Sequence, residues 1–173
     1  MSNDNVFLVL TAIGEDRPGL VGELSATISA HQGNWLESSM SQLAGKFAGI
    51  VKVDIARAHV DALQAALARL EGLKVTAETS VPAVAAKGRR MQLSLVGHDR
   101  IGIVREVTQT LVRHTVNVEK LETFISTAAM SADTLFNAHA ILHLDAALDP
   151  QVLARELEAI SNDLMVDLTV AEE

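Results

Sequence analysis

The sequence predicts an α+β protein of two units, each with the element order βαββαβ. One observation is a repeat: residues 14–34 align with residues 97–117 without a gap, at a spacing of 83 positions (97 − 14). Nine of these 21 positions are identical: Gly14, Asp16, Arg17, Gly19, Val21, Glu23, Thr27, His31 and Asn34. The other observation is that strand-like and helix-like apolar patterns alternate in the same order in both halves.

The first half gives each element in turn. Residues 6–13 have apolar side chains on both faces of a strand. This indicates a central strand that is buried on both faces and ends at Gly14. Apolar residues at helical spacing predict helix one over residues 20–31, with Pro18 at or near its first turn. Residues 34–55 read as a hairpin split at 43–46, followed by a helix from Val60 to about Leu70 and a strand after Gly72.

The second half repeats this order. It predicts strands at 91–97, 117–127, 135–145 and 164–170, and helices at about 102–114 and 150–162. Asp149 and Pro150 give a clear helix start. We expect domains at residues 1–81 and 91–173, joined by a linker at 82–90. Both have the ferredoxin-like pattern, in which two helices cover one face of an antiparallel sheet.

Composition and charge exclude several classes of function. The chain has 173 residues, 49% hydrophobic, no cysteine and a net charge of −8. The acidic charge argues against direct nucleic-acid binding, and no apolar run approaches the length that spans a bilayer. With no secretory pattern at the N-terminus, we expect a cytoplasmic protein. No metal, cofactor or nucleophile motif occurs, so no cofactor is expected and the chain is predicted to be non-catalytic.

The histidines do not change this expectation. His31 and His114 are predicted at matching helix ends, and His139 and His143 lie too far apart along one strand to share a metal. His98 stands where the first copy of the turn has Glu15, so it can modify the second site. Trp35 is expected to be a packing anchor at a sheet edge or an interface.

The repeated Gly-x-Asp-Arg-x-Gly turn is the candidate site. A helix start presents free N–H groups and a partial positive charge, and a glycine there leaves the backbone accessible to a carboxylate. Asp16 and Asp99 can cap the helix or accept hydrogen bonds from an ammonium group, while Arg17 and Arg100 can fork onto a carboxylate. These groups suit a zwitterionic amino acid, although the same residues also fit an ordinary helix start.

Beyond these residues, "GEDRPGLVGELSATISAHQGNW" and "GHDRIGIVREVTQTLVRHTVNV" resemble the start of ACT domains. The resemblance covers nearly the whole chain as two copies, a layout similar to that of the glycine cleavage system repressors. It implies a small amino acid, such as glycine, bound at the interface between paired domains. The binding residues that it implies are Asp16, Arg17, Gly19, Leu20 and Asn34 in the first copy, and Asp99, Arg100, Gly102, Ile103 and Asn117 in the second.

The resemblance also implies regulation of transcription through a DNA-binding regulator protein, with no direct contact to DNA. Uncovered sheet faces make a homo-oligomer plausible. Two alternatives stay open: a regulatory subunit of an amino-acid or folate-linked enzyme, and a small hydrolase of acylphosphatase type on the same topology. The residues leave open the effector, the partner and the sign of regulation.

Overall fold

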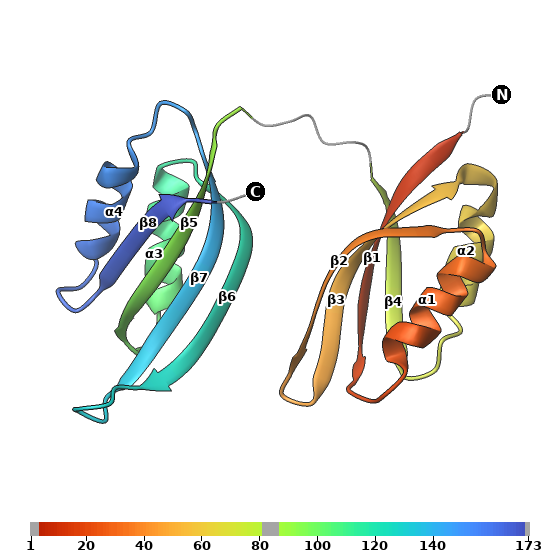
Figure 1. Cartoon of the computed structure of the whole chain (residues 1–173), viewed down its shortest axis with the longest axis horizontal. Helices are drawn as coiled ribbons and strands as arrows, with labels where there is room; N and C mark the ends of the chain where they lie inside the picture. The colour runs from red at the N-terminus through yellow and green to blue at the C-terminus, as the bar shows by residue number, and fades with distance from the viewer. Residues whose placement is uncertain (1–3, 81–86, 172–173) are drawn as a thin grey trace. The chain divides into compact units, whose positions relative to one another are not determined.

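The computed structural model (Figure 1) describes residues 4–80 and 87–171 and divides the chain into two compact units, residues 1–84 and 85–173. Residues 82–86 of the expected linker lie outside the described residues. Each unit is an α+β sandwich of two layers: a four-stranded antiparallel sheet with two helices on one face (Figure 1). The predicted ferredoxin-like fold is confirmed for both units.

In the first unit the sheet order is β2-β3-β1-β4, so the first and third strands are central. The elements are β1 (Asn5–Glu15), α1 (Leu20–Ala30), β2 (Asn34–Leu43), β3 (Lys46–Ala56), the 3₁₀ turn η1 (Arg57–His59), α2 (Val60–Leu67) and β4 (Leu73–Ser80). The hairpin between β2 and β3 turns at Ala44 and Gly45. Both residues have positive φ, 49° and 78°, as a two-residue turn that follows the twist of the strands requires.

The second unit repeats the topology with the order β6-β7-β5-β8. Its elements are β5 (Arg89–His98), α3 (Ile103–Arg113), β6 (Asn117–Thr127), β7 (Thr134–Leu144), α4 (Pro150–Glu158) and β8 (Met165–Val170). Arg89 and Arg90, expected in the linker, are the first residues of β5 and pair with Leu144 and His143. The helix start at Asp149 is confirmed, because its carboxylate accepts a hydrogen bond from the Gln151 N–H at 2.9 Å.

Each unit has its own apolar core between the sheet and the helices. In α1 the buried side chains recur every four residues, at Leu20, Leu24 and Ile28, and they pack with Leu8 and Leu10 of β1. Burying each such side chain stabilises the fold by roughly 1.5–3 kcal/mol. Trp35 of the edge strand β2 packs against this core, as expected of an anchor.

The prediction that residues 6–13 are buried on both faces is wrong. Leu8, Leu10 and Ala12 are buried beneath the helices, whereas Ile13 on the opposite face is 49% exposed. No helix covers that second face in Figure 1. The apolar residues of β1 therefore reflect a central strand with one open face, and the strand extends through Gly14 to Glu15 instead of ending at Gly14.

In the second unit, the residues of β7 alternate between the core and the open face. Phe136, Ala138, Ala140, Leu142 and Leu144 of β7 are buried in the core, while His139 and His143 point to the other face. There the His139 ring lies 5.8 Å from the Phe124 ring, and His143 Nδ1 lies 3.4 Å from a Glu119 oxygen. The two histidines have separate partners.

Candidate functional site

The repeated turn leads from the end of the first strand into the first helix of each unit. In the first unit the Asp16 N–H donates to the Gly45 carbonyl at 2.9 Å, and in the second the Asp99 N–H donates to the Thr134 carbonyl at 2.9 Å. In the first unit this hydrogen bond joins the turn to the loop between β2 and β3. In the second unit it joins the turn to the first residue of β7. The turn is therefore held against the neighbouring hairpin before the helix begins.

A glycine, and not an aspartate, occupies the N-cap position of each helix. Gly19 has φ 95° and Gly102 has φ 93°, both left-handed, and neither cap has a side-chain hydrogen bond. The expectation that Asp16 and Asp99 cap the helices is therefore wrong. The left-handed dihedral explains the glycine, since a Cβ added at Gly19 would meet only Glu23 Oε1, at an ordinary 3.8 Å.

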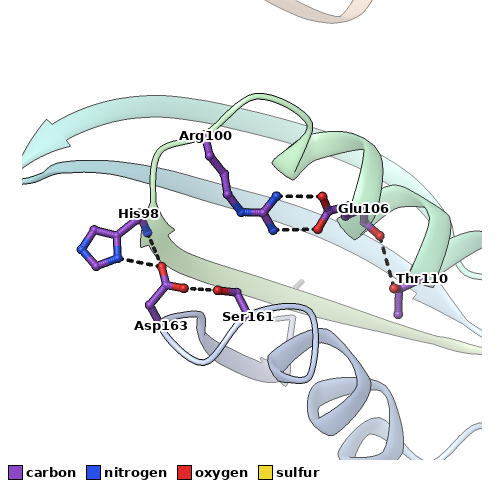
Figure 2. A network of polar contacts seen from close by, with 6 residues as sticks. All are labelled: His98, Arg100, Glu106, Thr110, Ser161 and Asp163. Carbon is purple, nitrogen blue, oxygen red and sulfur yellow. Dashed lines mark hydrogen bonds and ion pairs between the residues drawn. The ribbon is translucent and has the colours of Figure 1, made fainter.

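The two arginines of the turn bind carboxylates of their own helices. Arg17 donates from Nη1 to Glu23 Oε1 at 2.6 Å and from Nη2 to Glu23 Oε2 at 2.8 Å. In the second unit Arg100 makes the same fork onto Glu106, at 2.7 and 2.6 Å (Figure 2). The sequence suggested that each arginine forks onto the carboxylate of a ligand, and it missed the glutamates that each arginine binds in this structure.

The glutamates could have been found from the repeat, because Glu23 and Glu106 are among its identical positions. The hydrogen bonds from Arg17 and Arg100 hold the pKa of Glu23 and of Glu106 below its ordinary value of 4.5. Arg17 also donates to the Glu71 carbonyl at 3.3 Å, which links the turn to the connection between α2 and β4. The arginines thus order the turn.

A hollow of about 130 Å³ opens beside the turn of the first unit. Its lining comes from the turn, from the first residues of α1 and from β3: Asp16, Arg17, Gly19, Leu20, Val21, Gly22 and Phe47. Among the described residues, the Asp16 carboxylate has no hydrogen-bond partner, and the N–H groups of Leu20, Val21 and Gly22 donate to no protein acceptor. An uncommitted anion and free N–H donors therefore border the same small space.

Asn34 and Asn117 do not join the turns of their own units. Each opens the strand that follows helix one, and Asn34 lies opposite Asp54, near the start of β1. Helix α1 has 11 residues and at about 1.5 Å per residue separates Asn34 from the Gly19 turn by roughly 16 Å. The structure brings together Asp16, Arg17, Gly19 and Leu20, and leaves Asn34 at the other end of the helix.

The second unit adds a polar cluster beside its turn. The His98 N–H donates to Asp163 Oδ2 at 2.7 Å, and His98 Nδ1 lies 2.9 Å from the same oxygen (Figure 2). Ser161 donates to the other oxygen of Asp163, and on the far side of the ring His98 Nε2 lies 3.6 Å from Asp133. Hydrogen bonding by Ser161, and then by the His98 N–H, holds the pKa of Asp163 well below 3.8.

Other hollows lie on the sheets. One of about 500 Å³ lies on the open face of the first unit beside Thr11, Ile13 and Ile50, and an apolar groove runs between α3 and β6. In residues 4–80 and 87–171, no three His, Asp or Glu side chains are grouped so as to hold a metal ion. Within the same ranges, no helix is both long and apolar enough to cross a membrane.

Comparisons with known proteins agree with this fold. Residues 6–78 match the ACT domain family. A UPF0237 protein of Methanopyrus kandleri is 38% identical over 52 residues, and the match spans 30% of this chain and only 58% of that relative's length.

Two solved structures match across both units. A protein of unknown function from Galdieria sulphuraria has a TM-score of 0.81 at 26% identity, over 97% of this chain and 99% of that one. The structure of a candidate glycine cleavage system transcriptional repressor has a TM-score of 0.68 at 15% identity, over 96% and 99% of the two chains. Residues 6–78 therefore match the ACT domain family, and the second unit has the same sheet topology and the same turn.

Proposed function

We propose that this chain is an amino-acid-sensing regulator that controls transcription through a protein partner and does not bind DNA itself. The observation that carries the sensing part is the hollow at the Asp16 turn, with a free carboxylate and free N–H groups at its border. A carboxylate and an N-terminal helix turn are the two groups needed to hold a zwitterion.

The ligand's carboxylate accepts from the N–H groups of Val21 and Gly22, and its ammonium group donates to Asp16. Arg17 does not bind the ligand directly, because its guanidinium is already committed to Glu23. It positions the turn. A hollow of about 130 Å³ is smaller than the roughly 300–1,000 Å³ of drug-sized sites, so the ligand is a small amino acid such as glycine.

Calorimetric titration of the chain with glycine, L-alanine and L-serine tests this assignment. Asp16→Asn removes the negative charge that pairs with the ammonium group, and we expect at least a tenfold loss of affinity. Asp61→Asn is the matched control, since it removes the same charge from an exposed position at the start of α2 in the same unit. No heat with any of the three amino acids at millimolar concentration would contradict the proposal.

Asn34 distinguishes two forms of the site. A site made only by its own unit predicts that Asn34→Ala leaves the affinity unchanged. A site completed by Asn34 of another copy of the chain predicts weaker binding that depends on protein concentration, because assembly then contributes to ligand binding.

The regulatory part rests on the net charge of −8 and on the fold shared with the candidate repressor. An acidic surface disfavours DNA phosphates but can contact a basic regulator protein. Crosslinking in the source cell's lysate with and without glycine, followed by identification of the captured protein, tests this part. Capture of a DNA-binding regulator supports it, whereas capture of an amino-acid or folate enzyme supports the role of an enzyme's regulatory subunit.

A further inference from the structure

The two turns differ at one position that borders the hollow. Gly22 is the third residue of α1 and lines the hollow of the first unit, where a Cβ would meet no heavy atom within 4 Å. The corresponding third residue of α3 is Arg105. The smallest side chain of the first turn is therefore replaced by one of the largest in the second, at the place where the ligand would lie.

The direction of helical side chains decides where Arg105 lies. In an α-helix the Cα–Cβ bond tilts toward the N-terminus, so a residue in the first turn covers the surface over the preceding turn. Arg105 is exposed and has no hydrogen-bond or ion-pair partner among the described residues, whereas Arg100 is committed to Glu106. Beyond its electrostatic attraction to Glu106, whose carboxylate lies beside Gly102, its side chain is free to cover the Gly102 turn.

Charge acts in the same direction as size. A zwitterion would place its ammonium group at the Asp99 carboxylate, and the guanidinium of Arg105 competes for that carboxylate and repels the ammonium. The first turn has no equivalent cation, because Arg17 is bound by Glu23 and Gly22 has no side chain.

We propose that Gly22 and Arg105 determine ligand access, so that the first unit alone takes a small amino acid and Arg105 excludes it from the second. This inference rests on the proposed function of the turn. It gives the two copies different roles: the first responds to the ligand, and the second keeps the same scaffold without a ligand of this class.

Calorimetric stoichiometry of the full chain with glycine, L-alanine and L-serine tests the proposal. We expect one site per chain in the wild type, at least a tenfold loss of affinity in Gly22→Arg, and two sites per chain in Arg105→Gly. Ala30→Arg is the control, because it adds the same charge at an exposed position in the last turn of α1, about 12 Å along the helix from Gly22. It should keep one site of wild-type affinity.

Misfolding does not confuse this test, because arginine is a better helix former than glycine and Gly22→Arg should melt no lower than the wild type. Two sites in the wild type, or unweakened binding in Gly22→Arg, would overturn this inference and leave the proposed function intact. One site in Arg105→Gly would overturn Arg105 as the excluding group. No binding to the wild type would overturn the proposed function, and this inference with it.

Discussion

The guanidinium of Arg17 forms a two-pronged contact with the carboxylate of Glu23, at 2.6 and 2.8 Å, across the left-handed Gly19. Arg100 and Glu106 repeat the contact across Gly102 (Figure 2). The pair connects a residue three positions before the helix to the fourth residue inside it. In the first unit it ties the start of α1 to the turn, where the N–H groups of Leu20, Val21 and Gly22 have no protein acceptor among the described residues.

This contact should make stability depend on pH. Because the pKa of Glu23 is lowered by Arg17, the pair stabilises the fold above the ordinary pKa of 4.5, and this contribution is lost as the pH falls through the lowered value. Urea unfolding followed by Trp35 fluorescence reports on the first unit. The stability difference between wild type and Glu23→Gln should be largest near pH 7 and should shrink below pH 4.5.

A difference that stays constant from pH 7 to pH 3 would contradict this interpretation. Glu78→Gln is a suitable control, because Glu78 lies on β4, away from the turn. It should show no such convergence. The effect at neutral pH should be modest, since both partners are more than a third exposed and water screens the pair.

Two glycines of the first turn should respond in opposite ways to alanine. Gly19→Ala places a Cβ on a residue with φ 95° and should lower the free energy of unfolding by about 1–2 kcal/mol. Gly22→Ala lies inside the helix with open space around it and should raise the free energy of unfolding by roughly 0.5–1 kcal/mol. Thermal melts of the two variants measure the difference, and equal effects would show that the left-handed cap is not what requires Gly19.

The sequence predicted the order and type of the elements because their apolar patterns are local. Leu20, Leu24 and Ile28 show the helical period directly. Burial on both faces of residues 6–13 was predicted wrongly, since a pattern within one strand does not reveal whether a second layer covers the sheet. Helix α4 also ends at Glu158, earlier than the predicted 162.

The candidate site could be predicted only where its residues are neighbours along the chain. Asp16, Arg17, Gly19 and Leu20 do lie together, but Asn34 is separated from them by the length of α1. The partner of Arg17 was missed because Arg17 precedes the helix, so its contact with Glu23 does not follow the usual spacing of three or four residues. The spacing of Arg17 and Glu23 along the sequence does not predict their contact, because the left-handed Gly19 between them changes the path of the chain.

The pKa of Asp163 should depend on Ser161. The Ser161 hydroxyl makes the largest contribution to the lowered value, ahead of the His98 N–H. Ser161→Ala should therefore raise the pKa toward 3.8, as measured by carboxyl carbon chemical shifts during an NMR titration. Ser131→Ala is the reciprocal control, because Ser131 hydrogen-bonds to Asp133. It should raise the pKa of Asp133 and leave that of Asp163 unchanged.

The last prediction concerns Gly14 and Gly97, which are equivalent in the repeat but tightly packed for different reasons. A Cβ at Gly14 would overlap the carbonyl oxygen of Gly72, which is backbone and cannot rotate away. A Cβ at Gly97 would lie 2.7 Å from Leu164 Cδ1, the end of a flexible side chain. Gly14→Ala should therefore cost about 3 kcal/mol and Gly97→Ala about 1 kcal/mol, the upper and lower ends of the usual cost of overpacking.

Denaturant unfolding measures both costs, with Trp35 fluorescence for the first unit and hydrogen exchange of the β5 amides for the second. Gly45→Ala measures the cost of backbone strain without atomic overlap, because Gly45 has φ 78° and no heavy atom lies within 4 Å of its added Cβ. If Gly14→Ala were no more destabilising than Gly97→Ala, the Gly72 backbone would have to yield as easily as a leucine side chain. The close approach of β1 to the start of β4 would then not be what requires glycine at position 14.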